Sequence, residues 1–226
     1  MEIKIAILCV ATILLWATTL IWGMKFLRRS NYLLGIEYLV VTVSTTNLFI
    51  YLMSESQLAY DISFFLDAFS RAAGIPIIAT AGLMAVTHNY KPSKTVDILF
   101  FVGAFVGTAA LLSIDVFAKP LPYFYLVMWS SFSIYLVYFG YRLIQVGEYR
   151  HAVHVVIAML CGQAIATIYD FFKIPGDEQQ IIFLILALTT WSYLVVVLYY
   201  AFYALKRATI SSGGADVNEA FVEKAG

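Results

Sequence analysis

The stretch IIFLILALTTWSYLVVVLYYAFYAL, residues 181–205, has 25 consecutive residues without a charged side chain. An α-helix rises about 1.5 Å per residue, so about 20 apolar residues are enough to cross the roughly 30 Å of hydrocarbon in a bilayer. The core of a water-soluble protein does not tolerate apolar blocks of this length. The stretch therefore predicts a membrane-spanning helix, which we expect over residues 179–205.

Six earlier blocks have the same character, and short connections with turn residues separate them. We expect spans at about 5–24, 33–53, 60–87, 94–117, 122–144, 152–173 and 179–205. The blocks lack the alternation of period two that transmembrane β-strands show, and they are about twice as long as such strands. The fold class that follows is an all-α membrane protein with a bundle of seven transmembrane helices.

The composition agrees with this fold class and bounds the domain organisation. The chain is 62% hydrophobic and 12% charged, with a mean hydropathy of +0.85, whereas soluble domains carry about 25% charged residues. The spans and their loops occupy residues 1–207 as one transmembrane domain. Residues 208–226 are small, polar and acidic, and bury too little apolar surface to offset the entropy of ordering, so they predict a mobile cytoplasmic tail.

Positive charges are divided unevenly between the two sets of loops. One set carries nine: Lys25, Arg28, Arg29, Lys91, Lys94, Arg142, Arg150, Lys206 and Arg207. The opposite set carries three: Lys4, Lys119 and Lys173. Positive residues accumulate on the cytoplasmic side of membrane proteins. We therefore expect the N-terminus outside, the C-terminus in the cytoplasm, and a multi-pass protein integral to the plasma (inner) membrane.

The third span carries charged residues at a depth where lipid disfavours them. Asp67 and Arg71 are four residues apart, so they share a helix face and can pair. A charge near mid-membrane costs at least about 2.5–3.5 kcal/mol on insertion scales, which makes the pair a candidate site. Pro76 follows at mid-membrane and predicts a kink. Two interpretations stay open: Arg71 receives an anionic group from outside, or the pair only fixes helix packing.

Other polar side chains lie at comparable depth in neighbouring spans. Single hydroxyls and amides in membrane helices mostly hold helices together. Taken together, however, they predict a polar cavity open to the outside and lined by the second, third, sixth and seventh spans. The candidate ligand-binding residues are Asp67, Arg71, Asn47, Gln163, Asp170 and Trp191.

Glu37 lies about one turn inside the predicted cytoplasmic end of the second span. Its side chain can extend along the helix toward Arg28 or Arg29, as long charged side chains do near span ends. The alternative is a neutral, protonated acid in a proton relay. The simpler interpretation, an acid that reaches the cytoplasmic rim, is the one we expect.

Several chemistries have no residues to support them. The block 179–205 lacks the mid-span lysine that a retinal Schiff base needs, and haem ligands are missing within the bundle. His88, His151 and His154 lie at the cytoplasmic rim, where a shallow metal site is an alternative to plain solvation. Motifs for soluble-enzyme chemistry do not occur. We expect no enzyme activity, no cofactor and no nucleic-acid partner.

Three classes of function remain. The first is a small-solute transporter with its site around the third span, and its partner would be a small-molecule or anionic solute. The alternatives are a sensor or binding module that signals through a separate cytoplasmic partner, and a structural membrane subunit. The lipid bilayer is the one partner that the composition itself implies.

Overall fold

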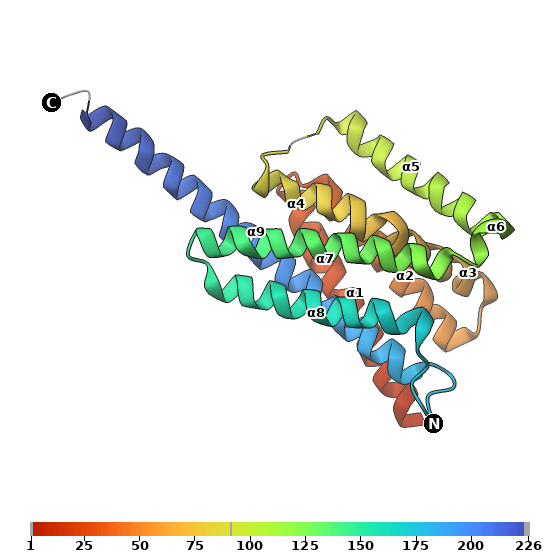
Figure 1. Cartoon of the computed structure of the whole chain (residues 1–226). Coiled ribbons are helices and arrows are strands. Elements are labelled where there is room, and N and C mark those ends of the chain that lie inside the picture. Colours follow the sequence, from red (N-terminus) through yellow and green to blue (C-terminus); the bar gives the residue numbers. More distant parts are fainter. Residues whose placement is uncertain (1, 91, 224–226) are drawn as a thin grey trace.

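The computed structural model describes the backbone of residues 2–90 and 92–223, and every regular element in these ranges is helical (Figure 1). In chain order the elements are α1 (Glu2–Arg28), α2 (Tyr32–Ser54), α3 (Gln57–Phe69), the π-helix η1 (Ser70–Ala79), α4 (Thr80–Thr87), α5 (Lys94–Ser113), α6 (Asp115–Ala118), α7 (Leu121–Gln145), α8 (Tyr149–Phe171) and α9 (Ile181–Glu223). The predicted all-α fold class is confirmed.

Within the described residues, seven helical segments are long and apolar enough to cross a membrane. They are α1, α2, the continuous run α3–η1–α4, α5, α7, α8 and the first part of α9. The chain is therefore a multi-pass membrane protein. The side of the membrane that each terminus faces, and the membrane itself, stay predictions.

The fourth span ends earlier than the sequence predicts. Ile114 has an extended backbone, with φ −104° and ψ 111°, so α5 ends at Ser113. After Ile114, residues Asp115–Ala118 form the separate short helix α6. At the other end of the chain, α9 continues as a helix to Glu223, past the end of the bundle (Figure 1). The predicted mobility of residues 208–226 stays a prediction, and residues 224–226 lie outside the described part.

Six of the spans form a closed ring. α1 lies between α2 and α9, α2 also packs against α3 and η1, η1 packs against α7, and α8 joins α7 to α9. The helix α5 lies outside this ring and packs mainly against α3 and η1 (Figure 1). The helix α5 therefore takes no part in closing the ring.

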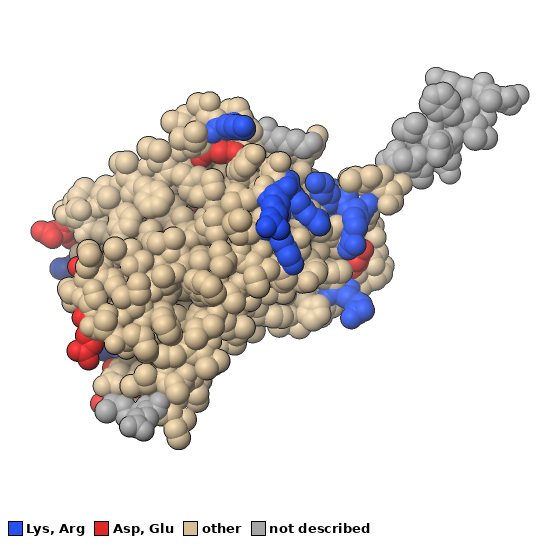
Figure 2. Space-filling view, turned by 180° about the vertical axis from the view of Figure 1, so that it is seen from behind, with Lys and Arg blue, Asp and Glu red and all other residues tan. Residues whose placement is uncertain are grey.

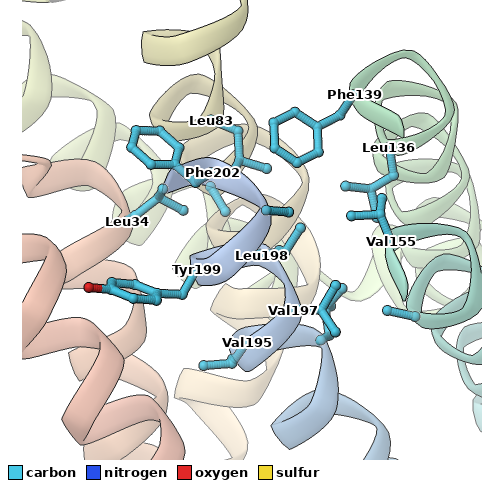
Figure 3. Close-up of a cluster of buried hydrophobic side chains, with 14 of the residues drawn as sticks. Leu34, Leu83, Leu136, Phe139, Val155, Val195, Val197, Leu198, Tyr199 and Phe202 are labelled. Carbon is cyan, nitrogen blue, oxygen red and sulfur yellow. The ribbon is translucent and has the colours of Figure 1, made fainter. Parts of the chain in front are cut away.

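One half of the ring is solidly packed. Its largest buried cluster lies near the turn between α1 and α2, with α9 at its centre (Figure 3). Tyr199 and Phe202 of α9 pack against the ring of Phe26 of α1, while Val197 points toward α7 and α8 (Figure 3). Packing contacts of this kind, rather than the hydrophobic effect, hold helices together inside a bilayer.

Charged side chains lie mostly at the two ends of the bundle. Figure 2 shows Lys and Arg gathered at the end from which α9 extends, with most Asp and Glu of the visible face at the opposite end. The uneven charge distribution predicted from the loops is therefore present in space. For clarity we call these the basic end and the acidic end.

The acidic end contains a loop, between α8 and α9, that is held by a buried carboxylate. Asp177 accepts the N–H of Ile182 at 3.0 Å and the N–H of Phe183 at 2.9 Å. These are two of the backbone donors that the start of a helix leaves unsatisfied. Burial raises the pKa of Asp177, but the backbone hydrogen bonds outweigh burial and hold the pKa below its ordinary value.

We predict that Asp177→Ala lowers the free energy of unfolding by roughly 0.5–2 kcal/mol at neutral pH, as the loss of a helix cap does. Because the folded-state pKa is lowered, this stabilisation is present above the ordinary value of 3.8 and is lost as the pH falls through the folded pKa. Thermal unfolding of both forms in detergent between pH 7 and pH 3 checks this. The exposed neighbour Glu178, replaced by Gln, is the control, and a pH-independent difference contradicts the prediction.

The contact between α1 and α2 depends on a glycine. A Cβ at Gly35 would lie 2.5 Å from Cδ2 and 3.0 Å from the backbone nitrogen of Leu27, whereas nothing lies within 4 Å of a Cβ at Gly103 of α5. We predict that Gly35→Ala destabilises the protein by about 1–3 kcal/mol through overpacking. Gly103→Ala is the matched control and should be neutral or stabilising, since Ala favours the helix by up to about 1 kcal/mol. Equal unfolding temperatures for both variants would contradict this.

Candidate functional site

The third span changes its winding at its midpoint. The residues Ser70–Ala79 form a π-helix with Pro76 inside it. Proline has no backbone N–H to donate and its ring obstructs the preceding turn, so it disrupts regular α-helical bonding. π-Helical turns are rare and occur often at functional sites. The kink predicted from Pro76 is thus a change of helix type, and Ser70, Arg71 and Gly74 lie in the rewound segment.

Arg71 is held by groups from two neighbouring spans. Its Nη2 is hydrogen-bonded to Oδ2 of Asp170 on α8. The guanidinium lies 4.0 Å from the ring centroid of Tyr125 on α7 and 3.7 Å from that of Tyr169 on α8. Cation–π contacts of this kind add to the ion pair. Arg71 therefore ties the third span to α7 and α8, and its guanidinium lies against two aromatic rings.

Asp67, the partner of Arg71 predicted from the sequence, lies farther from the guanidinium than Asp170 does. Its Oδ2 lies 3.8 Å from Nη1 of Arg71 and accepts a hydrogen bond from the Tyr169 hydroxyl at 3.3 Å. We call Asp67, Arg71, Tyr125, Tyr169 and Asp170 the Arg71 cluster. With all three charged groups ionised, two carboxylates face one guanidinium, so the cluster carries a net negative charge. The side chain of Asp67 is 25% exposed and that of Arg71 13%, so the acid is the more accessible group.

A cavity of about 520 Å³ lies beside this cluster. It is lined by α1, α2, α3, η1 and α9, with Trp129 of α7 and Tyr169 of α8. Its rim includes the exposed Gln179 and Gln180 at the acidic end, and its deepest residues include Tyr38, near the packed half. All four spans expected to line a cavity do so. Most of the wall is apolar, however, and less polar than the sequence predicts.

The predicted site residues are divided between the cavity and other places. Asp67, Arg71 and Trp191 line the cavity, and Asp170 reaches it only through Arg71. Asn47 is not among the lining residues, and its amide donates to the carbonyl of Val43 on its own helix at 2.9 Å. Gln163 bonds to Ser133 at 2.8 Å and Ser130 at 3.2 Å, and so joins α8 to α7 away from the cavity.

Glu37 does not extend to the basic rim as the sequence led us to expect. Its side chain is fully buried, and its Oε1 accepts a hydrogen bond from the Ser70 hydroxyl at 2.9 Å. Its Oε2 receives no hydrogen bond from the described residues. A Cβ at Gly74 would lie 2.2 Å from Oε1, so the carboxyl packs directly on the π-helix backbone. One signal was available: Glu37 is three residues after Leu34, on the core face of α2.

The histidines do not converge on one place. His88 Nδ1 lies 2.9 Å from the Thr87 hydroxyl, His151 Nδ1 lies 3.0 Å from Glu148 Oε2, and His154 Nδ1 lies 2.7 Å from the Tyr193 hydroxyl. The described residues contain no group of three or more His, Cys, Asp or Glu arranged to hold a metal ion. The alternative of a shallow metal site at His88, His151 and His154 therefore has no geometric support.

Comparison of the chain with family models, with curated proteins and with solved structures found no match. Fold alone does not identify a function in any case, because one fold hosts many activities. The chemistry of the cavity and of the Arg71 cluster is what remains to support a function.

The Arg71 cluster predicts strong energetic coupling between Arg71 and Asp170. Arg71→Gln leaves two partly exposed carboxylates without their cation and is expected to cost about 1–3 kcal/mol of stability. Adding Asp170→Asn removes one of those carboxylates. The double variant should therefore lose about 1–3 kcal/mol less stability than the two single variants lose together. Thermal or denaturant unfolding in detergent measures this cycle.

A control pair lies at the basic rim, where His151 and Glu148 are 31% and 35% exposed. Glu148→Gln weakens a contact with His151 that water can replace, so it should change stability by less than about 1 kcal/mol. Additive losses at Arg71 and Asp170, or an effect of Glu148→Gln as large as that of Arg71→Gln, would contradict the prediction.

Proposed function

We propose that this multi-pass membrane protein transports a small amphipathic solute that carries a positive charge, and that the solute binds in the central cavity. The observation that carries the proposal is the cavity itself, inside a ring of six spans and reaching the acidic end of the bundle. Its volume of about 520 Å³ lies within the range of about 300–1,000 Å³ that small-molecule sites occupy. A subunit that only packs has no need of such a space.

The distribution of wall residues indicates the chemical class of the solute. Leucines of three helices, Leu15 of α1, Leu48 of α2 and Leu188 of α9, line the apolar side. The α3–η1 side presents Ser63, Asp67 and other polar groups. An apolar body with one polar end matches both sides, as is usual for small-molecule sites with few, well-placed polar groups.

The charge of the Arg71 cluster favours a cationic end over the anionic one expected from sequence. The Arg71 guanidinium lies against two tyrosine rings and is bonded to Asp170, so an anion would have to compete with these partners. Asp67 lines the cavity, is partly exposed, and makes its contacts with Arg71 and Tyr169 through Oδ2. A protonated amine can approach this carboxylate without breaking the Arg71–Asp170 pair.

The architecture suits movement of the solute. The cavity reaches one end, while the cluster around Leu198 and Phe202 closes the other (Figure 3). The π-helix η1 interrupts the third span at the depth of Arg71. Secondary transporters commonly place their sites at interrupted helices near the bilayer midplane. Rewinding of η1 is therefore a means of opening the packed half while closing the cavity rim.

A test uses two small molecules of similar size and opposite charge, phenethylamine and 3-phenylpropionate. We predict that the amine raises the unfolding temperature of the purified protein and that the carboxylate does not. Asp67→Asn should weaken amine binding at least tenfold, about 1.4 kcal/mol. Asp61→Asn is the control, because this exposed acid lies on the same helix, bonds to Gln57, and does not line the cavity. Preference for the carboxylate would overturn the proposed solute class.

The sensor interpretation has one specific observation in its favour. Leu188 and Trp191 of α9 line the cavity, and the same helix continues past the basic end of the bundle to Glu223. Occupancy of the cavity could thus displace an element that leaves the membrane. Proteoliposomes separate the two functions: uptake of labelled amine that Asp67→Asn abolishes supports transport, whereas binding without uptake supports sensing.

A further inference from the structure

The buried acid Glu37 lies directly behind the cavity wall. Ser70 lines the cavity and its hydroxyl donates to Oε1 of Glu37 at 2.9 Å. Tyr38, the neighbour of Glu37 in the chain, also lines the cavity. Ser70 is thus the side chain that stands between the carboxyl and the space open to the acidic end. The proposed solute contacts at Asp67 do not use this acid.

The cationic side chains of the elements that pack on α2 are engaged elsewhere. Lys25 of α1 lies 3.6 Å from the centroid of the Trp22 ring, Arg28 is exposed at the end of α1, and Arg71 of η1 is bonded to Asp170. α4 has no ionisable side chain. The remaining titratable residues of these elements are Glu2, Lys4 and Cys9 in the first part of α1, Asp61 and Asp67 on α3, and the tyrosines.

An ionised carboxylate in this position would therefore lack a countercharge. Ser70 donates one hydrogen bond, Oε2 receives none from the described residues, and the side chain is fully shielded from solvent. Burying an unpaired charge is far more costly than burying a neutral polar group. Ionisable groups inside membrane spans mark proton and ion pathways when they lack a structural partner.

We propose that Glu37 is a proton-binding site: it holds a proton in the state seen here and releases it to the cavity when η1 rewinds. In the release step the O–H bond of the carboxyl breaks, the electron pair stays on the carboxylate, and a water molecule of the cavity takes the proton. Ser70 then donates its hydrogen bond to the resulting anion. The proton is the coupling ion of the transporter, an inference that rests on the proposed function.

The contact with Gly74 links proton binding to helix conformation. A Cβ at this position would lie 2.2 Å from Oε1 and 2.5 Å from Cδ of Glu37, so the carboxyl and the η1 backbone cannot move independently. Arg71 follows Ser70 directly in η1. A solute that draws Asp67 away from Arg71 therefore acts on η1, the segment that contacts Glu37. Movement of η1 would then link solute binding to proton release.

Infrared spectroscopy of the full-length protein in lipid vesicles, without solute, tests the protonation state. We expect a carbonyl band of a neutral carboxylic acid at pH 7 that is absent in Glu37→Gln and retained in Asp61→Asn. The band should disappear from the wild type as the pH is raised. A wild-type spectrum at pH 7 without a Glu37-dependent band overturns the proposal. Glu37→Gln keeps the size of the side chain, and an unchanged unfolding temperature shows that it folds.

Hydrogen–deuterium exchange tests the link to η1. At the pH where the band is lost, amides of Ser70–Ala79 should exchange at least tenfold faster in the wild type than in Glu37→Gln. At pH 7 the two proteins should exchange alike. Equal exchange at both pH values overturns the coupling. Neither measurement needs a solute, so a failure of phenethylamine to bind rejects the proposed solute class and leaves these results interpretable.

Discussion

A guanidinium at mid-bundle has to be neutralised inside the protein, because lipid offers it no solvation. Arg71 meets this constraint with Asp170 as its hydrogen-bonded partner, Asp67 as a second acid, and the rings of Tyr125 and Tyr169 within about 4 Å of its guanidinium. These groups come from three spans, so neutralising one charge also fixes how the third span sits against α7 and α8. Asp67, Arg71 and Tyr169 of this group also form part of the wall of the cavity.

The bundle is built in two unequal halves. Toward the basic end, α9 is surrounded by close-packed aromatic and aliphatic side chains such as Phe26, Leu198 and Phe202. Toward the acidic end, the same six spans leave an open space between them. The π-helix lies where the two halves meet, and so does Glu37. A segment with irregular hydrogen bonding at this boundary can shift with less disruption than a regular helix could.

Much of the fold was predictable, because a helix that crosses lipid needs a long apolar block, and such blocks are easily recognised in the sequence. The seven spans lie where the apolar blocks are, and the pairing of Asp67 with Arg71 follows from helical spacing. The rest of the site was less accessible. Asn47 and Gln163 have the polarity of ligand-binding residues, yet one bonds to its own helix and the other to the neighbouring α7. Depth can be read from sequence, whereas the direction of a side chain around a bundle cannot.

What the amino-acid sequence determined by itself is the number and order of the spans, since each requires a sufficiently long apolar block. Only the tertiary structure shows which side chains pair with the charged residues inside the spans. Asp170 is 99 residues from Arg71 and became its nearest acid through the meeting of α8 with η1. Glu37 was brought against Gly74 rather than to the rim, because helix rotation is set by packing between spans and not by the residues of one span.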